Sequence, residues 1–309
     1  MREPRETFVI VNPAAAAATT GRRWQRIARA LRRELGPFEH AMTEGPRHAT
    51  ALTRRALDDG FKRIVAVGGD GTLSEIANGF FDGRRPRARG AVLGVIPRGT
   101  GSDFARTLGI ESGLDIACAR LGRATPRAID VGYASFVDHH GRPAGRVVLN
   151  AASFGCGGAV AAAVGARAKR LGGRLAFMLT TARTLLRYRD QTVSVRVDDG
   201  APETLKITCC AVCNGRFFGG GMQVAPEARL DDGRLDVTVW QGFGFRDFLV
   251  KRRALYDGTH VHDPGTRTLR AARVHATSAE RVPLEIDGEA VGILPATFEI
   301  IPAALRVVA

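Results

Sequence analysis

The chain has 309 residues, of which 45% are hydrophobic, 25% charged and 6% aromatic, and its formal net charge is +14. This length and composition are typical of a globular protein with about two domains. The positive charge favours anionic partners such as nucleotides, nucleic acids or membrane surfaces, although a solvated basic surface is the commoner explanation. The scarce aromatic residues do not alternate with basic ones, which argues against a platform for single-stranded nucleic acid. We therefore expect no nucleic-acid partner.

The five cysteines are an odd number in a long chain, which argues against a disulfide framework and suits a reducing compartment. Cys209, Cys210 and Cys213 lie in an apolar run and are expected to be buried small hydrophobic residues rather than zinc ligands. The first residues lack the apolar stretch of a signal peptide, and no segment approaches 18 uninterrupted apolar residues. These features predict a cytoplasmic protein.

Strands and helices alternate over the first part of the chain. This alternation predicts an α/β domain over residues 1–126 with a parallel, Rossmann-like sheet covered by helices. The expected strands are Thr7–Val11, a short strand ending at Met42–Thr43, Ile64–Val67 and Ala91–Ile96. The expected helices are Arg22–Leu35, Arg47–Leu57, one beginning near Leu73, Phe104–Leu108 and Leu114–Leu121.

The pattern changes near Arg127, where period-two alternation replaces the helical spacing. It predicts a β-rich, mostly antiparallel domain over residues 127–295. Within it, Tyr133–Ala144 is interpreted as a polar connection and Gly173–Arg187 as the main helix. The final segment, 296–309, is expected to be strand-like and to return to one of the two domains, with the first domain as one alternative.

A glycine loop follows the strand Ile64–Val67. Gly68-Gly69-Asp70-Gly71-Thr72 leads directly into a helix, and the N–H groups at a helix N-terminus can bind an anion. Glycine allows a phosphate to approach the backbone closely. An aspartate beside an anion is unfavourable unless it holds a metal ion or accepts a proton. The alternative is an ordinary strand–turn–helix corner.

A second glycine loop, Gly99-Thr100-Gly101-Ser102-Asp103, follows the strand Ala91–Ile96. In open α/β sheets, ligands bind beyond the carboxyl ends of the strands. Asn12 and Thr43 follow two other strands and are expected at the same edge. Two such loops suit a nucleoside triphosphate and its metal ion better than either loop alone.

Two segments, Val67–Gly79 and Gly94–Ile110, resemble the paired signatures of the diacylglycerol kinase catalytic-domain family. The resemblance is to its soluble bacterial lipid-kinase branch, which is related to sphingosine kinases and NAD kinases. It extends in order along nearly the whole chain. The later matching segments are Cys213–Leu235, Glu285–Glu289 and Leu294–Leu305.

The resemblance implies a two-domain, NAD-kinase-like enzyme that uses ATP and Mg²⁺. Asp70 would act near the phosphates and Mg²⁺, and Glu289 would take the proton from the acceptor hydroxyl. Both carboxylates qualify as the base by residue type, so the choice between them stays open. The residues expected to contact the nucleotide are Asn12, Thr43, Gly68, Gly69, Asp70, Gly71, Thr72, Glu75, Thr100 and Gly101.

The family also implies a structural Mg²⁺ in the second domain, at Arg229, Asp232 and Arg234. Asp232 would be its only side-chain ligand, because arginine could contribute only a backbone carbonyl. The Asp231-Asp232-Gly233 and Asp287-Gly288-Glu289 segments are also simple turn sequences, and this alternative stays open for both.

The implied function is transfer of the γ-phosphoryl group of ATP to a lipid hydroxyl, most simply that of diacylglycerol, giving phosphatidic acid. The Pro97–Arg106 and Gly219–Met222 segments resemble lipid kinases only, which disfavours the alternative of an NAD kinase. The chain departs from the family pattern at Ala14–Ala18, Arg98 and Ser102. A second alternative is therefore a catalytically silent membrane-surface or regulatory protein.

A lipid substrate implies peripheral contact with the inner face of a membrane. The cationic cluster expected to make this contact comprises Arg167, Lys169, Arg170 and Arg174. A set of apolar residues on the predicted helix has two interpretations. They are expected either to line an acyl-chain cleft or, as is commoner for residues at helical spacing, to belong to the core. That set comprises Phe177, Met178, Leu179, Leu185 and Leu186. The sequence does not indicate an oligomeric state.

Overall fold

The computed structural model describes residues 6–99, 101–111, 113–168 and 173–308, with side chains described outside 165–177. The chain forms two compact units. Unit 1 comprises Met1–Ile129 and Ala303–Ala309, and unit 2 comprises Asp130–Pro302. Among the described residues, no helix is long and apolar enough to cross a bilayer.

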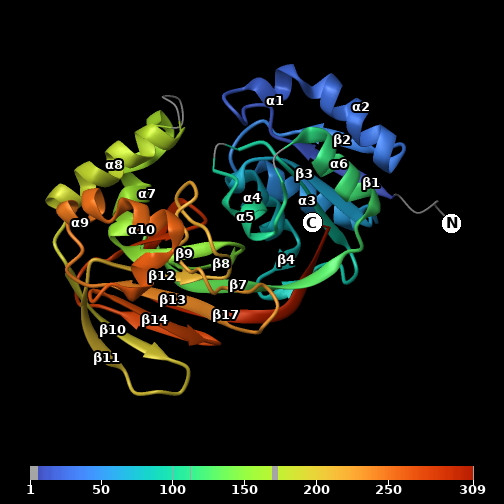
Figure 1. Cartoon of the computed structure of the whole chain (residues 1–309). Helices are drawn as coiled ribbons and strands as arrows, with labels where there is room; N and C mark the ends of the chain where they lie inside the picture. Colours follow the sequence, from blue (N-terminus) through green and yellow to red (C-terminus); the bar gives the residue numbers. More distant parts are fainter. Residues whose placement is uncertain (1–5, 100, 112, 169–172, 309) are drawn as a thin grey trace. The chain divides into compact units, whose positions relative to one another are not determined.

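Unit 1 is built on a parallel sheet in the order β2-β1-β3-β6, with the end of β17 paired to β6. Val9 and Val65 face one side of this sheet and Ile10 and Ile64 the other, and all four are buried. The strands are β1 (Thr7–Val11), β2 (Glu39–Met42), β3 (Arg63–Gly68), β6 (Val92–Pro97) and the short β4 (Phe81–Asp82) and β5 (Arg85–Pro86). The sheet confirms the predicted parallel α/β architecture (Figure 1).

Helices cover both faces of this sheet. The apolar stripe of α2, Trp24, Ile27 and Leu31, packs with α6 on the face that carries Val9 and Val65. The helices α3 and α4 pack against each other and against β1 and β3. The helices are α1 (Thr19–Arg22), α2 (Trp24–Leu35), α3 (His48–Asp58), α4 (Asp70–Gly79), α5 (Asp103–Thr107) and α6 (Leu114–Arg123).

Unit 2 is an antiparallel β-sandwich, which confirms the predicted β-rich second domain. One layer has the order β14-β13-β12-β9-β16-β17, and β10, β11 and β15 form the other side. Phe154, Ile207 and Phe298 belong to the core between the layers. The strands are β7 (Arg127–Asp138), β8 (Pro143–Val148), β9 (Ala151–Gly155), β10 (Gln191–Val197), β11 (Glu203–Ile207), β12 (Cys209–Cys213), β13 (Leu235–Trp240), β14 (Thr266–Ala271), β15 (Arg273–Thr277), β16 (Pro283–Ile286) and β17 (Glu289–Val308).

A helical layer covers the opposite face of β9, β12 and β16. Its core includes Val160, Leu185, Phe248 and Leu255, packed on Trp240. The helices are α7 (Cys156–Ala168), α8 (Gly173–Arg187), α9 (Phe245–Val250), α10 (Arg252–Asp257) and the 3₁₀ helix η1 (Thr259–His262). Cys210 and Cys213 are buried in the sheet beneath, as predicted, whereas Cys209 beside them is half-buried.

In unit 2 one prediction was wrong and one helix was missed. The segment Tyr133–Ala144 is not a polar connection, because β7 and β8 pair across it and bury Ala134 and Phe136 on one face. The helix α7 was not predicted, because its glycine- and alanine-rich sequence lacks an apolar–polar period. Its glycines permit close packing, since a Cβ at Gly158 would overlap the carbonyl of Pro283.

The strand β17 runs without interruption from Glu289 to Val308 (orange to red in Figure 1). It begins in unit 2, where it pairs with β16 and β15. It ends in unit 1, where Arg306–Val308 pair in parallel with Val92–Gly94 of β6.

Candidate active site

Several of the predicted nucleotide-binding residues of unit 1 follow adjacent parallel strands. The hydrogen bonds between neighbouring strands continue one residue past the end of three strands. The N–H of Asn12 donates to Val67 O (2.9 Å), and the N–H of Thr43 donates to Val11 O (2.8 Å). The N–H of Arg98 donates to Gly68 O (2.7 Å). Asn12, Thr43 and the glycine loop that starts at Gly68 therefore lie along one edge of the sheet.

The two glycine loops touch each other. A Cβ at Gly69 would lie 3.2 Å from the Gly99 Cα, and a Cβ at Gly99 would lie 2.9 Å from the Gly69 Cα. Such an approach of backbone to backbone requires glycine on both sides. Asp70 begins α4, and its Oδ1 accepts the N–H of Phe104 (3.2 Å) at the start of α5. The loops thus form one structure.

This pair of loops can bind an anion. The N–H groups in the first turn of α4 have no acceptor within the helix, and its N-cap, Gly69, places no side chain over them. Asp70 supplies a half-buried carboxylate at the same point. Thr100 lies outside the described residues. Gly101 is held by Arg106, whose Nε donates to its carbonyl oxygen (3.1 Å).

The side chains of Asn12 and Thr72 bind each other. The Nδ2 of Asn12 donates to Thr72 Oγ1 (2.8 Å), and Asn12 Oδ1 accepts the N–H of Ala14 (3.0 Å). Ala16–Ala18, where the chain departs from the family pattern, all have positive φ and form a left-handed turn. The structure thus gives Asn12 and Thr72 a role in holding the loop together.

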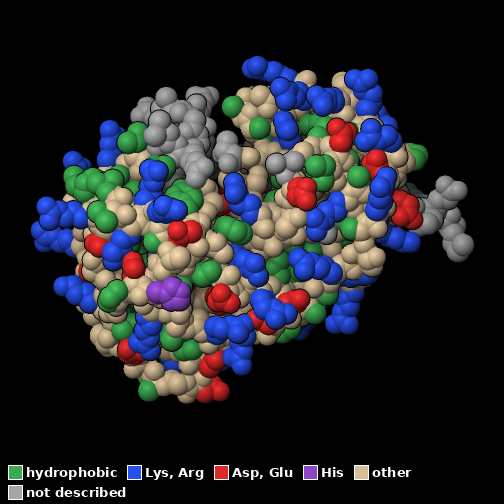
Figure 2. All heavy atoms as spheres, viewed as in Figure 1, with side chains coloured by type: hydrophobic (Ala, Val, Ile, Leu, Met, Phe, Trp, Pro, Cys, Tyr) green, Lys and Arg blue, Asp and Glu red, His purple; other side chains and the backbone are tan. Residues whose placement is uncertain are grey.

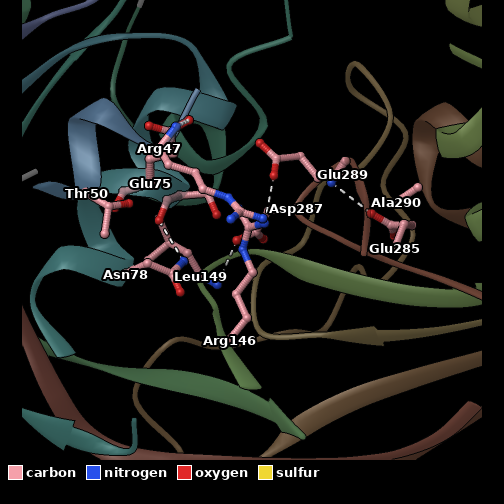
Figure 3. A network of polar contacts seen from close by, with 12 residues as sticks. Arg47, Thr50, Glu75, Asn78, Arg146, Leu149, Glu285, Asp287, Glu289 and Ala290 are labelled. Carbon is pink, nitrogen blue, oxygen red and sulfur yellow. Dashed lines mark hydrogen bonds and ion pairs between the residues drawn. The ribbon is translucent and has the colours of Figure 1, made fainter. Parts of the chain in front are cut away.

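The carboxylate of Glu75 caps α3. It accepts the N–H groups of Arg47 (2.9 Å) and Ala49 (3.2 Å), while Thr50 Oγ1 donates to the Glu75 carbonyl (2.7 Å), as Figure 3 shows for the labelled residues. Glu75 therefore positions α3 beside α4, and its nucleotide contact stays a prediction.

In unit 2, Asp287 and Gly288 form the two-residue turn between β16 and β17, and their φ values are 49° and 83°. This is the left-handed turn that Asp-Gly sequences favour in hairpins, so the turn interpretation is right for the backbone. The Asp287 carboxylate accepts the N–H groups of Leu149 (3.1 Å), Asn150 (2.9 Å) and Ala151 (3.1 Å). These bonds fix the turn against the connection between β8 and β9.

Glu289 follows this turn and is accessible to solvent, with its side chain 36% exposed. Its Oε2 accepts a hydrogen bond from Arg146 Nη1 on β8 (2.7 Å), and Figure 3 shows the guanidinium directed at the carboxylate. A charge-assisted bond of this kind orients the carboxylate and balances its charge. Sequence reasoning missed Arg146, because 143 residues separate it from Glu289.

A cavity of about 220 Å³ lies between the helical layer and the sheet of unit 2. Its walls are almost entirely apolar and include Val160, Leu185, Met222, Phe248 and Leu255. It is also lined by Glu285 and Gly288, so it extends to the hairpin turn that precedes Glu289. Of the five helix residues expected at an acyl cleft or in the core, Leu185 lines this cavity and Met178 is half-buried. Leu179 and Leu186 are exposed, and Phe177 lies outside the described side chains.

Among the described residues that line the cavity, Glu285 is the one with a carboxylate, and it is fully buried. Burial raises its pKa to about 8, although hydrogen bonds from Ser153 Oγ (2.6 Å) and the Gly288 N–H (2.8 Å) act in the opposite direction. Glu285 is therefore mostly protonated and neutral at pH 7, which suits an apolar cavity.

The predicted structural metal site falls on a surface turn. Asp232 Oδ1 accepts the N–H of Arg234 (3.0 Å), and its Oδ2 pairs with Arg270, while Arg229 Nε donates to Asp231 Oδ1 (3.4 Å). Within the described ranges, no three His, Cys, Asp or Glu side chains are grouped to hold a metal ion. Of the three predicted residues, only Asp232 has a carboxylate, and that carboxylate is already paired with Arg270. A metal ion here would therefore depend on backbone carbonyls.

Comparison with known proteins finds two family models along the chain. The "Diacylglycerol kinase catalytic domain" matches residues 6–134, and the "YegS C-terminal NAD kinase beta sandwich-like domain" matches residues 150–309. Together they cover both units.

Similar proteins match over most of their lengths. A diacylglycerol kinase of Bacillus subtilis (strain 168) is 30% identical over 94% of this chain and 91% of its own. A protein of Stenotrophomonas maltophilia (strain K279a) named "Probable lipid kinase YegS-like" is 34% identical over 84% of this chain and 82% of its own. The crystal structure of a diacylglycerol kinase from Bacillus anthracis str. Sterne shares the fold, with a TM-score of 0.72, 21% identity and coverage of 98% of this chain and 96% of that one.

Proposed function

This chain belongs to the diacylglycerol kinase catalytic-domain family, and on that premise we propose that it is an ATP-dependent lipid kinase with diacylglycerol as its acceptor. The product would be phosphatidic acid. The substrates would be ATP, bound at the glycine loops of unit 1, and a lipid bound in unit 2.

The observation that carries this proposal is the apolar cavity that extends to Gly288 in the turn between β16 and β17. Its walls suit a hydrocarbon chain, and the residue after Gly288 is Glu289, the carboxylate expected to receive the hydroxyl proton. NAD, in contrast, has no hydrocarbon chain to place against such walls, and its ribose and pyrophosphate groups are polar.

The reaction needs alignment, charge neutralisation and removal of one proton. We propose that Glu289 accepts the proton of the lipid hydroxyl while that oxygen forms a bond to the γ-phosphorus. The bond from the γ-phosphorus to the β–γ bridging oxygen breaks, and ADP leaves with its electron pair. Arg146, hydrogen-bonded to Glu289 at 2.7 Å, orients the carboxylate.

In unit 1, the N–H groups at the start of α4 would bind phosphate oxygens, and Asp70 would hold Mg²⁺ at the phosphates. The half-buried Asp70 carboxylate fits this role, because it is fixed at the junction of both glycine loops by the Phe104 N–H. Bound Mg²⁺ supplies neutralisation of the phosphate charge.

The test is transfer of labelled phosphate from ATP to a lipid panel in detergent micelles, with Mg²⁺. Dioleoylglycerol is expected to give labelled phosphatidic acid, whereas ceramide, monoacylglycerol and NAD are expected to give less product. Absence of any lipid-dependent product contradicts the proposal. Labelling of NAD alone would support the NAD-kinase alternative.

A matched pair of variants on α7 tests the cavity itself. Ala161 lines the cavity, whereas Ala162 on the same helix is exposed. Ala161→Phe is expected to lower activity on dioleoylglycerol by about tenfold or more, because the ring occupies volume that an acyl chain needs. Ala162→Phe is expected to leave activity unchanged. Equal activity of both variants would show that the acyl chain does not bind in the cavity.

A further inference from the structure

The large hydrophobic side chains exposed in the described part of the chain are unevenly distributed. Four of the six lie on α8 and α9 of unit 2: Leu179 (53% exposed), Leu186 (64%), Leu249 (56%) and Val250 (83%). The helices α8 and α9 pack against each other, so these four side chains belong to one region. Single exposed leucines need no explanation, but such a concentration indicates an interaction surface.

The arrangement along α8 separates an outer face from an inner one. Leu179 and Leu186 are seven residues apart and therefore share a face, and Arg183 lies between them on the same side. Thr181 and Leu185 point to the opposite side, where they line the apolar cavity. One helix thus contributes to the cavity wall and to the exposed surface.

The helix α9 repeats this pattern. Phe248 is buried and lines the cavity, while Leu249 and Val250 beside it are exposed. Arg252 and Arg253 follow at the start of α10 and are exposed as well. In Figure 2, hydrophobic side chains gather at the left of the view, over α8 and α9 of Figure 1, with Lys and Arg side chains around them.

The cations of α8 are available for an anionic partner. Arg183 and Arg187 line an open groove of about 520 Å³ between α7 and α8, together with Thr184 and Tyr188. Within the described residues, neither arginine has a carboxylate partner, whereas Lys251 near α9 pairs with acidic side chains. Guanidinium groups bind phosphate through two hydrogen bonds at once.

We propose that this helix-pair surface, comprising Leu179, Arg183, Leu186, Arg187, Leu249 and Val250, docks on an anionic phospholipid bilayer. The side chains would enter the boundary between headgroups and acyl chains, with the arginines at the phosphates. The proposal rests on the lipid-kinase function, because the same helices wall the cavity proposed for the acyl chain. Apolar residues interspersed with unpaired arginines match such a boundary in charge and polarity.

Vesicle flotation with the full chain tests this proposal. Wild type is expected to bind vesicles of equimolar phosphatidylcholine and phosphatidylglycerol, and to bind pure phosphatidylcholine vesicles much more weakly. Leu249→Gln/Val250→Gln and Arg183→Gln/Arg187→Gln are each expected to weaken binding by about tenfold. The arginine variant should also lose most of the salt dependence.

Matched controls come from unit 1. Ile116 on α6 is 49% exposed, and Arg26 and Arg29 are exposed on α2. Ile116→Gln and Arg26→Gln/Arg29→Gln are expected to bind vesicles like wild type. Equal effects of control and surface variants, or no binding of wild type to anionic vesicles, would overturn the docking surface.

A soluble acceptor separates this proposal from the proposed function. Phosphorylation of monomeric dihexanoylglycerol is expected to be unchanged in both surface variants, while phosphorylation of dioleoylglycerol in anionic vesicles falls with binding. If wild type phosphorylates no lipid but the surface variants still lose vesicle binding, the kinase proposal fails and the docking surface stands. If wild type is active and the surface variants bind vesicles like wild type, the docking surface is wrong and the kinase proposal stands.

Discussion

Three acidic side chains around one hairpin turn have three different environments. Glu285 is buried in the wall of the cavity, Asp287 accepts three backbone N–H groups, and Glu289 is accessible beside Arg146. Environment, rather than residue type, therefore separates their roles. Glu285 is suited to a neutral wall, Asp287 to fixing the turn, and Glu289 to proton transfer.

Replacing Glu289 by Gln is expected to lower turnover by roughly 100- to 10,000-fold, because an amide cannot accept the hydroxyl proton. The KM for ATP is expected to stay near the wild-type value. The measurement is steady-state phosphorylation of dioleoylglycerol. Glu203, which also pairs with an arginine at 2.7 Å, gives the matched control Glu203→Gln. Wild-type turnover in Glu289→Gln would assign the proton to another group, with Asp70 the other candidate.

Glu285 gives a pH-dependent prediction. Its folded-state pKa of about 8 lies above its ordinary value of 4.5, so between these pH values the folded chain holds a proton that the unfolded chain has lost. The free energy of unfolding therefore falls as the pH rises through this window. Glu285→Gln is expected to remove this dependence, which is on the order of a few kcal/mol. Denaturation between pH 5 and 8 measures it, and parallel curves for wild type and variant would contradict it.

At the scale of elements, the contact between the two glycine loops gives a further prediction. Gly99→Ala would place a Cβ 2.9 Å from the Gly69 Cα, so the loops must separate. ATP affinity is expected to fall by about tenfold, because the phosphate-binding N–H groups are displaced. Gly45→Ala is the matched control, since no atom lies within 4 Å of its added Cβ. Calorimetric titration with ATP distinguishes the two, and unchanged affinity in Gly99→Ala would contradict the prediction.

The glycine loops could be predicted because their signal is local: a strand, a turn without bulky side chains and a helix follow within a dozen residues. The carboxyl ends of parallel strands lie at the same edge of a sheet, which is why the positions of Asn12 and Thr43 at this edge could also be predicted. In contrast, α7 lacks an apolar period, and its Gly158 meets β16, which lies more than a hundred residues further along the chain. The hairpin over Tyr133–Ala144 was missed because most of its residues are small or polar, so its alternation of buried and exposed positions does not appear as an alternation of apolar and polar residues.

Contacts between distant residues could not be predicted. The pairing of Arg146 with Glu289 and the bond from Ser153 to Glu285 join positions more than a hundred residues apart. A single sequence read by itself carries no signal for such pairs. The cavity has the same origin, because its walls come from four helices and from the strands β12, β13 and β16, which lie far apart in the sequence.

At the scale of the whole molecule, β17 makes the end of the chain part of unit 1. Val307 is fully buried there and lies beside β6. Val307→Ala is expected to lower the free energy of unfolding of unit 1 by about 2 kcal/mol, through loss of buried methyl groups. Differential scanning calorimetry measures the shift, and the exposed neighbour provides the control Arg306→Gln. A variant as stable as wild type would show that unit 1 tolerates loss of this packing.

The volume of the cavity in unit 2 limits how a two-chain lipid could be bound. At about 220 Å³ it is smaller than the roughly 300–1,000 Å³ of pockets that enclose a drug-sized ligand, so it can hold only part of diacylglycerol. The remainder of the acceptor would stay anchored among its neighbours in the leaflet. Catalysis would then be interfacial: the rate would follow the mole fraction of acceptor in the surface rather than its bulk concentration. An adsorbed enzyme would process many acceptors before it desorbs.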